Sequence, residues 1–467
     1  MIIFFKGKSN LIAVDTNKEL NTADLEKLIW LFEQATLIEN ETVSGIYVGP
    51  RKEMITPWST NAVEITQNMG INGILRIEEF FQIEAEHQKF DPMLQVVYKG
   101  LNQQVFTISH QPEPILYIED IAAYSYKEGL ALSEDEIAYL NGVSQKIDRK
   151  LTDSEVFGFS QVNSEHCRHK IFNGNFIIDG VEKPSTLFQL IKKTTQTNPN
   201  TILSAYKDNC SFSKGPASEQ FAPKTQDKPD FFQITDIQTV LSLKAETHNF
   251  PTTVEPFNGA ATGTGGEIRD RMAGGKGSFP IAGTAVYMTA YSRNDEEGRS
   301  WENATEPRPW LYQTPEDILI KASNGASDFG NKFGQPLING SVLTFEHFEN
   351  QKKFGYDKVI MQAGGIGYAR LEDCLKSVPD VGNKVVLLGG DNYRIGMGGG
   401  AVSSVDTGEF DSHIELNAVQ RANPEMQKRA YNTIRALAES GNNPIISIHD
   451  HGAGGHLNCL SELVEES

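Results

Sequence analysis

Cysteine is scarce in this sequence of 467 residues. The four cysteines, Cys167, Cys210, Cys374 and Cys459, are scattered along the chain, and no two of them form a C-x-x-C pair. Neither a disulfide framework nor a metal site built from several cysteines is therefore indicated. This cysteine usage fits a reducing compartment.

Long apolar runs and excess positive charge are missing as well. No stretch reaches the ~18 apolar residues of a membrane-spanning helix, and the start, MIIFFKGKSNLIAVD, has no basic leading region or small-residue cleavage site. There are 42 Lys and Arg against 61 Asp and Glu, a formal net charge of -19. Because a nucleic-acid surface needs a basic patch to neutralise phosphates, we expect no nucleic-acid partner. The missing apolar run and leader predict no membrane association and a cytoplasmic location.

Glycine, by contrast, is plentiful, with 41 residues, and hydrophobic residues make up 39% of the chain. The length exceeds that of one ordinary core, so several domains are expected. In the amino-terminal part, SGIYVG and GILRIEEFF predict strands and TADLEKLIWLFEQA predicts a helix, typical of a small α+β domain. A polar linker region follows, where Thr152 and Glu155 form the S/T-x-x-E capping-box pattern of a helix start.

The second half of the chain predicts strands separated by glycine-rich segments. SKGPASEQFAPKTQDKPD predicts an exposed loop, TVLSLKAET and GTAVYMTAY predict strands, and HNFPTTVEPFNGAATGTGGEIRDRMAGGKG predicts a loop that leads into a helix. Further on, KVVLLGG predicts a strand and NPEMQKRAYNTIRALAES an amphipathic helix. The final stretch, NPIISIHDHGAGGHLNCLSELVEES, predicts a strand, a glycine turn and a helix, and we expect that the last domain has been cut there.

Residues 259–270, GAATGTGGEIRD, carry glycines that each cost about 0.8–1 kcal/mol relative to alanine inside a helix. Glycine lets backbone N–H groups approach a ligand, and a helix start carries positive partial charge, so a phosphate is the expected partner. The standard signatures are not met, because Lys276 has no Ser or Thr directly after it and Ile268 stands where a dinucleotide fingerprint needs a small residue. GMGGGA, residues 396–401, fits G-x-G-x-x-A, and we interpret it as a turn.

Acidic and basic residues flank this glycine segment. Glu246 ends the preceding strand, and Asp270 follows the glycines beside Arg269. Mg²⁺ prefers one or two carboxylates together with substrate phosphates, and Lys244, two residues before Glu246, shares its face of the strand and can pair with a phosphate. Surface salt bridges are the alternative for each residue alone. Together they predict a Mg-nucleotide site.

Histidines form two clusters. In SQVNSEHCRHKIFNG, His166 and His169 are three residues apart and could share a helix face as zinc ligands do, with the remaining ligands from HDHGAGGH at residues 449–456. A thiol nucleophile at Cys167 would need an activating base, and a buried small hydrophobic side chain is the simpler interpretation of that residue. A histidine beside a phosphate is the third alternative.

Five motifs occur in an order that resembles the phosphoribosylformylglycinamidine synthase family of purine biosynthesis, in its large single-chain form: NSEHCRHKIF, KAETHNFPTTVEPFNGAATGTGGEIRD, NKFGQPLING, GGDNYRIGMGGGAVSS and HDHGAGG. Near the amino end, VGPRKEMITPWSTNAVEITQNMGI resembles the family's first domain, which is similar to the small PurS subunit of the split enzyme. The resemblance extends over nearly the whole chain.

This resemblance implies a ligase that converts formylglycinamide ribonucleotide (FGAR) to formylglycinamidine ribonucleotide (FGAM). In the family, ATP phosphorylates the amide oxygen, and ammonia displaces the phosphate of the resulting iminophosphate. A glutaminase domain supplies the ammonia, and ATP and Mg²⁺ are the cofactors. Since the sequence stops at Ser467, we expect the second half and the glutaminase domain to be absent, and the fragment to be inactive alone.

The implied fold is a multidomain α+β and α/β protein. We predict a PurS-like α+β domain in residues 1–145, a linker domain that carries SEHCRHK in 146–205, a PurM-like ATP-binding domain in 206–372 and the truncated start of a second PurM-like domain in 373–467.

The resemblance also assigns site residues, motif by motif. His166 is the catalytic histidine that stabilises the phosphoryl group or the iminophosphate, and His248 is the second active-site histidine, a proton acceptor. Mg²⁺ is assigned to Glu246, Asp270 and Asp450, and the ribonucleotide substrate to Thr247, Asn249, Arg269 and Gln420. ATP is assigned to His169, Lys244, Gly259, Ala260, Ala261, Thr262, Gly263, Thr264, Gly265, Gly266, Glu267, Ile268, Arg269 and Asp270. Phe250 departs from the HNHP of many relatives, so no polar contact is carried over there.

Two other functions stay open. One is another PurM-like kinase or synthase, acting for example on thiamine phosphate, selenide or a hydrogenase-maturation carbamoyl group, against which the PurS-like segment and SEHCRHK argue. The other is nucleotide binding without turnover, because phosphoryl transfer needs all reacting groups held together.

Overall fold

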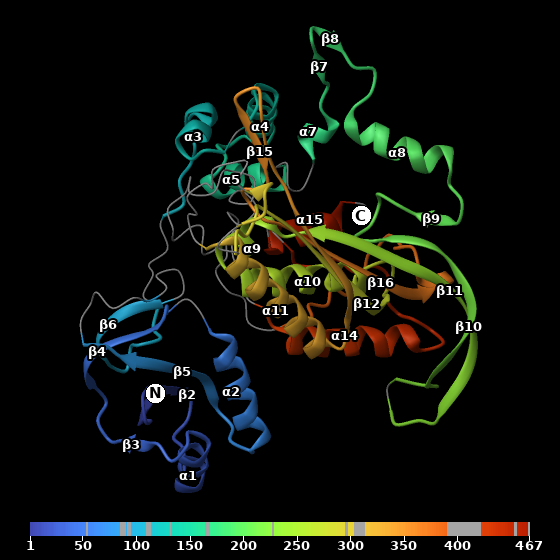
Figure 1. Ribbon diagram of the computed structural model, residues 1–467. Coiled ribbons are helices and arrows are strands. Elements are labelled where there is room, and N and C mark those ends of the chain that lie inside the picture. Colours follow the sequence, from blue (N-terminus) through green and yellow to red (C-terminus); the bar gives the residue numbers. More distant parts are fainter. Residues whose placement is uncertain are drawn as a thin grey trace. The chain divides into compact units, whose positions relative to one another are not determined.

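The computed structural model describes residues 1–52, 55–84, 90, 95–108, 114–130, 132–163, 169–226, 228–294, 298–302, 313–389, 422–452 and 455–465. The chain forms two compact units, Met1–Pro114 and Ile115–Ser467 (Figure 1). Both contain helices and strands, in agreement with the predicted class. Within the described ranges we find no helix with the length and apolar character needed to cross a membrane.

In the described residues of the amino-terminal unit, six strands form an antiparallel sheet, and two helices accompany it. In chain order its elements are β1 (Ile2–Lys6), β2 (Leu11–Thr16), α1 (Thr22–Leu31), β3 (Thr36–Ile38), β4 (Val43–Pro50), α2 (Pro57–Asn68), β5 (Ile74–Gln82) and β6 (Gln95–Leu101). The strand order is β3-β1-β2-β5-β4-β6. The strands predicted from SGIYVG and GILRIEEFF, now β4 and β5, and the helix predicted from TADLEKLIWLFEQA, now α1, are confirmed.

A hydrophobic cluster packs on each face of this sheet. Neighbouring residues of a strand point to opposite faces and therefore enter different clusters. Phe5 lies in one hydrophobic cluster together with Leu28 of α1. Its neighbour Phe4 lies in a second cluster, together with Ala13 of β2 and Phe80 of β5. The apolar run at the start of the chain is therefore the centre of a folded domain.

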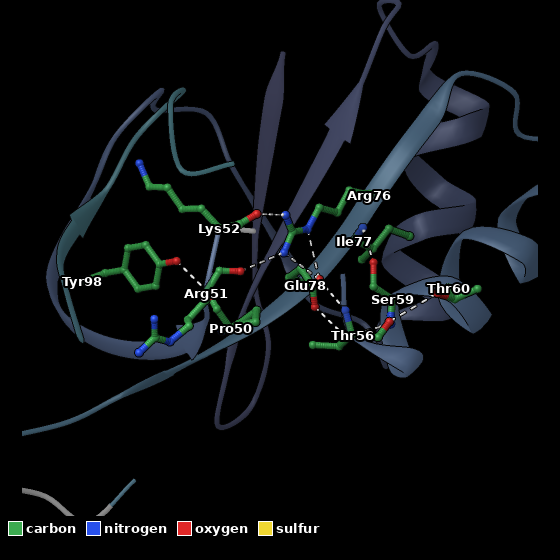
Figure 2. Close-up of polar contacts among 10 residues, drawn as sticks. All are labelled: Pro50, Arg51, Lys52, Thr56, Ser59, Thr60, Arg76, Ile77, Glu78 and Tyr98. Atoms are coloured by element: carbon green, nitrogen blue, oxygen red, sulfur yellow. Dashed lines mark hydrogen bonds and ion pairs between the residues drawn. The ribbon is translucent and has the colours of Figure 1, made fainter. Parts of the chain in front are cut away.

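A buried ion pair in this unit holds the connection between β4 and α2 (Figure 2). Arg76 and Glu78 are alternate residues of β5, so they share a face, and Arg76 Nη2 lies 3.0 Å from Glu78 Oε1. Glu78 accepts hydrogen bonds from the backbone N (3.0 Å) and the hydroxyl (2.6 Å) of Thr56, and Arg76 Nη1 donates to the carbonyl of Lys52 at 2.7 Å. Thr56 is also the N-cap of α2, where it accepts from Ser59 N at 3.0 Å. The pair thus fixes both ends of the connection.

Helices dominate the start of the second unit. They are α3 (Ile121–Lys127), α4 (Glu134–Lys146), α5 (Asp153–Val162), α7 (Lys170–Asn173) and α8 (Leu187–Thr197), with a short hairpin of β7 (Ile177–Ile178) and β8 (Val181–Glu182). The capping box predicted at the start of α5 is confirmed, since Thr152 Oγ1 accepts from Glu155 N at 3.1 Å and the Glu155 carboxylate accepts from Thr152 N at 2.9 Å. A small core that includes Ile121, Leu140 and Val156 joins α3, α4 and α5.

A second sheet of six strands forms the body of this unit. Its strands are β9 (Ile202–Ser204), β10 (Ser211–Pro223), β11 (Phe232–Thr247), β12 (Phe279–Thr289), β13 (Leu337–Thr344) and β16 (Ile360–Arg370), and the hairpin β14 (Glu346–Glu349) and β15 (Lys352–Gly355) precedes β16. The order is β13-β12-β16-β11-β10-β9, and only the β12–β13 pair among these is parallel. The strands predicted from TVLSLKAET and GTAVYMTAY are confirmed as parts of β11 and β12.

The prediction of an exposed loop from SKGPASEQFAPKTQDKPD is wrong for residues 213–223, because these residues belong to β10. This strand pairs with β11 from Ser211 to Pro223, with an irregularity between Lys214 and Ala217. Pro216 stands inside that irregular stretch, where a proline removes no regular ladder bond. Pairing with a long neighbouring strand outweighs the weak strand preference of the Pro, Ser and Gly residues.

The prediction of a glycine-rich loop before a helix is also wrong, because Gly259, Gly263, Gly265 and Gly266 lie inside a helix. Residues 249–272 form α9 (Asn249–Val254) and α10 (Pro256–Met272), and α11 (Pro315–Phe333) packs beside α10. A Cβ on Gly259 would lie 2.5 Å from the backbone of Pro251, and one on Gly265 would lie 2.6 Å from the ring of Phe329. The glycines therefore allow α10 to approach α9 and α11 closely, where a side chain would not fit.

Two helices lie near the end of the chain, α14 (Pro424–Glu439) and α15 (Gly455–Val464), and both predicted helices are confirmed. Tyr431 and Ile434 of α14 share a core with Ile268 of α10 and Phe333 of α11. The strand predicted from KVVLLGG is not formed in residues 384–389, nor is the one predicted in 443–450. A strand needs a hydrogen-bonded neighbour as well as apolar residues, and no ladder reaches these segments within the described residues. GMGGGA lies outside the described residues.

Candidate functional site

The end of β11 lies against the carboxyl-terminal half of α10. Lys244 and Glu246 are alternate residues of the strand and face the same way, as predicted. Lys244 Nζ lies 2.5 Å from Asp270 Oδ2. A Cβ on Gly266, one helical turn before Asp270, would lie 3.1 Å from Glu246 Oε1. Gly266 therefore leaves the space between helix and strand that the Glu246 carboxylate occupies.

A third acidic residue reaches this place from the end of the chain. Arg269 Nε donates to Asp450 Oδ2 at 2.8 Å, so α10 carries one member of each of two ion pairs. Asp450 lies in HDHGAGG, and its two oxygens accept from Arg269 and from Asn209 Nδ2, the latter at 2.6 Å. Asn209 was not among the residues singled out in the sequence.

The electrostatics of the three carboxyl groups differ. Burial raises the pKa of Asp270 well above its usual value, and the nearby charges of Asp450 and Glu246 add to this. Burial likewise raises the pKa of Glu246. Burial acts in the same direction on Asp450, but the charge and hydrogen bond of Arg269 outweigh it and lower that pKa. Among these three carboxyl groups, the one whose pKa is lowered lies beside the guanidinium of Arg269.

Oxygen donors of the kind that Mg²⁺ prefers are present here, but they are not arranged as a finished metal site. Glu246 Oε2 is buried and has no hydrogen-bond partner, whereas Asp270 and Asp450 are each paired with a cation. Among the residues that the structure describes, no group of three or more His, Cys, Asp or Glu side chains is placed to hold a metal ion. Three carboxylates are donors that fit Mg²⁺. Asp270 and Asp450 can bind it once their ion pairs with Lys244 and Arg269 are broken.

His248 follows β11 directly and contacts α10. Its Nδ1 lies 2.6 Å from the carbonyl oxygen of Gly259. A carbonyl oxygen only accepts, so in the neutral ring the hydrogen lies on Nδ1 and the lone pair on Nε2. Thr252 Oγ1 donates to the carbonyl of His248 at 2.5 Å, and His248 N donates to the carbonyl of Met361 at 2.9 Å. The ring is thus held in one tautomer, with Nε2 as the basic atom.

The other predicted substrate and histidine positions lie in different surroundings. Thr247 is exposed at the end of β11, and Asn249 Oδ1 accepts from the backbone N of Met361 at 3.1 Å. His169 precedes α7 with a left-handed backbone (φ 51°), and its ring stacks on Phe188 at 6.1 Å. His166 and Gln420 lie outside the described residues.

Most of the predicted ATP-binding segment is interior. The residues from Gly259 to Ile268 are buried on α10, so only Arg269 and Asp270 of this segment reach the ion pairs described above. Glu267 does not take part in these ion pairs. Its carboxylate lies 2.8 Å from Arg271 Nε, with both side chains 0% exposed. It also accepts a hydrogen bond from Gln335 Nε2 at 2.7 Å. Neither Arg271 nor Gln335 was singled out in the sequence, although the four-residue spacing of Glu267 and Arg271 on a helix was a signal for their pairing.

The zinc alternative has no support in the part of the chain that the structure describes. The rings of His451 and His456 lie 4.5 Å apart, edge to face, and His449 Nδ1 lies 3.6 Å from Glu462 Oε2. No set of three or more ligating side chains gathers around a common point in the described ranges. Cys167 lies outside them, so its predicted burial is not described.

Three protein-family models match this chain. Residues 10–106 match the formylglycinamide ribonucleotide amidotransferase N-terminal model, and residues 121–170 match the linker-domain model of the same amidotransferase. Residues 380–467 match the model of the AIR synthase related protein, C-terminal domain. The predicted fold class, with its amino-terminal, linker and PurM-like parts, is confirmed by these matches. The four domain boundaries given above stay predictions.

The chain is also similar to solved structures from Thermotoga maritima. One is PurL complexed with FGAR, with 23% identity, a TM-score of 0.43, and coverage of 70% of this chain and 41% of that chain. Another is PurL complexed with ATP, with 20% identity, a TM-score of 0.37, and coverage of 70% of this chain and 40% of that chain. The chain thus spans about two fifths of the length of these structures.

Proposed function

Because this chain belongs to the formylglycinamide ribonucleotide amidotransferase family, we propose that it carries an ATP-binding part of an ATP-dependent ligase that converts FGAR to FGAM. The matches to the amino-terminal and linker models support this reaction over that of another PurM-like kinase or synthase. A glutaminase source of ammonia and a cytoplasmic location belong to the same proposal.

In the proposed reaction the amide oxygen of FGAR attacks the γ-phosphorus of ATP, and ADP leaves. The product is a phosphorylated amide, in which the oxygen has become part of a good leaving group. Ammonia adds to the amide carbon, one proton is removed from the nitrogen, and inorganic phosphate departs to leave the amidine. FGAR, ATP and ammonia are consumed, and FGAM, ADP and phosphate are formed.

The convergence of charged groups from β11, α10 and the HDHGAGG segment is the observation that carries this proposal. Lys244 and Arg269 are cations of the kind that bind phosphate oxygens. Lys244 is paired with Asp270, and Arg269 is paired with Asp450. When they bind phosphate instead, they release two carboxylates beside the unpartnered Glu246 Oε2.

These three carboxylates would then hold Mg²⁺, which neutralises charge on the transferring phosphoryl group when it is bound. His248 would accept the proton through Nε2, because Nδ1 is committed to the Gly259 carbonyl. His166 would stabilise the phosphoryl group, His169 would contact ATP, and Thr247, Asn249, Arg269 and Gln420 would contact the ribonucleotide. Residues 259–268 are buried inside α10, so the proposed ATP contacts of this segment fall to Arg269 and Asp270.

Calorimetric titration of MgATP, with and without FGAR, tests this proposal on wild-type chain and on Asp270→Asn. Asn has the shape of Asp, so this variant keeps the shape of the site while it removes the carboxylate that pairs with Lys244 and that we propose as a metal ligand. We expect the wild-type chain to bind ATP more tightly with Mg²⁺ than without it. In Asp270→Asn we expect Mg²⁺ to have no such effect on ATP binding. The matched control is Asp328→Asn, which removes a half-exposed partner of Lys332 on α11. A folded wild-type chain that does not bind MgATP would contradict the proposal.

A further inference from the structure

The carboxylate of Asp450 is held from two sides by residues far apart in the sequence. Arg269 Nε, 181 positions away, donates to Oδ2 at 2.8 Å. Asn209 Nδ2, 241 positions away, donates to Oδ1 at 2.6 Å. The first donor brings a full positive charge, and the second is a neutral amide. Both oxygens of one predicted metal ligand are therefore oriented by donors from distant parts of the chain.

Asn209 is itself anchored through its neighbour Asp208. The Asp208 side chain is 7% exposed, and its Oδ1 lies 2.7 Å from Lys376 Nζ. Its Oδ2 accepts from the backbone N of Gly275 at 2.8 Å, and Oδ1 accepts from Asn209 N at 2.7 Å. Asp208 thus ties the backbone of Asn209 to the turn after α10 and to the segment that follows β16.

Glycine at position 275 is required for this anchor. Its φ is +58°, a left-handed conformation, and a Cβ there would lie 2.1 Å from the carbonyl oxygen of Asp373. The same turn holds the segment that leads to Asp450, because Asn443 Nδ2 donates to the carbonyl of Lys276 at 3.0 Å. The site residue Arg269, the anchor and the approach to Asp450 therefore meet at one end of α10.

The chemistry of the second donor matters because a metal ligand must remain negative. A second cation on Asp450 would neutralise the carboxylate and compete with Mg²⁺, whereas an amide restrains an oxygen and leaves its charge in place. We propose that Asn209, held by Asp208, is a positioning residue that orients the carboxylate of Asp450 toward the metal of the nucleotide site. This inference rests on the function proposed above.

MgATP titration of Asn209→Ala and Asn209→Asp tests the inference, together with titration of Mg²⁺ at fixed ATP and of ATP in the presence of EDTA. We expect Asn209→Ala to weaken MgATP binding about tenfold and Asn209→Asp, which has the same size, to weaken it further, because a carboxylate then faces the carboxylate of Asp450. Binding of ATP without Mg²⁺ should change less than twofold in Asn209→Ala. The matched control is Asn10→Ala in the amino-terminal unit. It removes the hydrogen bond that the Asn10 side-chain amide donates to the Glu79 carboxylate at 2.5 Å.

Several outcomes would overturn the inference. Equal weakening of ATP and MgATP in Asn209→Ala would mean that the residue only supports the fold. Wild-type affinity in Asn209→Ala would mean that Asp450 needs no amide donor, and wild-type affinity in Asn209→Asp would mean that only side-chain size matters. If Asn209→Asp does not fold, the Mg²⁺ dependence of Asn209→Ala decides alone. A wild-type chain without MgATP affinity overturns the proposed function and, with it, this inference. A wild-type chain that binds MgATP, together with any of the variant outcomes above, overturns the inference alone.

Discussion

Lys244 Nζ and Asp270 Oδ2 lie 2.5 Å apart and connect the end of β11 to the last turn of α10, with side chains 23% and 14% exposed. Burial acts to lower the pKa of Lys244, but the charges of Asp270 and Glu246 outweigh it and raise that pKa. The lysine is therefore charged at neutral pH. Its charge holds the end of β11 to α10 through Asp270, and a phosphate that binds Lys244 would compete with that carboxylate.

Replacement of Lys244 by methionine keeps the length of the side chain and removes its charge. We expect Lys244→Met to weaken MgATP binding at least tenfold, about 1.4 kcal/mol, because a phosphate loses its cation and Asp270 loses its partner. Calorimetry measures the affinity. Lys8→Met is the control, since Lys8 pairs with Glu33 at 3.1 Å on the exposed surface of the other unit and such pairs contribute about 0–1 kcal/mol. Wild-type affinity in Lys244→Met would exclude the lysine from the site.

Two helical glycines should respond to alanine in opposite directions. A Cβ on Gly259 would lie 2.5 Å from the backbone of Pro251, so Gly259→Ala must displace α9, and we expect a loss of about 2 kcal/mol or more. Gly142 in α4 has no heavy atom within 4 Å of its Cβ position, so Gly142→Ala should stabilise the chain by about 0.4–1 kcal/mol. Urea unfolding measures both. Equal effects at the two positions would contradict the close helix contact.

The stability contribution of Glu78 should depend on pH. Burial raises its pKa above the ordinary value of 4.5, although Arg76 and Thr56 act in the opposite direction. Below pH 4.5 both folded and unfolded chains carry the proton. As pH rises above 4.5, the unfolded chain loses its proton first, so stability falls until the folded pKa is passed.

Glu78→Gln has no such titration, so the stability of wild type relative to this variant should decrease as pH rises above 4.5. Urea unfolding between pH 4 and pH 7 measures the difference. Glu26→Gln, which changes an exposed carboxyl group on α1, controls for the loss of one negative charge. A wild-type advantage that grows with pH would show that Arg76 dominates over burial.

The buried cysteines should be poor nucleophiles. Burial raises the pKa of Cys210 to about 12 and that of Cys459 to about 11. For Cys210 this means roughly a thousandfold less thiolate than in an ordinary thiol. We expect iodoacetamide at pH 8 to label both at least a hundredfold more slowly in the native chain than in urea, as read from the peptides by mass spectrometry. Rapid labelling of Cys210 in a folded chain would contradict its burial.

Short-range patterns in this sequence predicted local structure well. The capping box at Thr152, the strands of the amino-terminal domain and the shared face of Lys244 and Glu246 all depend on neighbours within four positions. The glycine segment and β10 were predicted wrongly, because a helix rich in glycine and a strand rich in proline are weak locally. Contacts with Pro251, Phe329 and β11 stabilise them, and these contacts appear only in the folded chain.

The sequence alone indicated the family and the class of fold, because those depend on motifs and on residue types. It also predicted the charged residues Lys244, Glu246, Arg269, Asp270 and Asp450 as site residues, and that assignment stays a prediction. Tertiary structure alone decided which charges meet. It paired Lys244 with Asp270 and Arg269 with Asp450, placed Glu267 on Arg271 inside the core, and brought Asn209 to Asp450. Hydrogen bonds and ion pairs act over a few ångströms in space, and no local pattern encodes a distance of 241 positions along the chain.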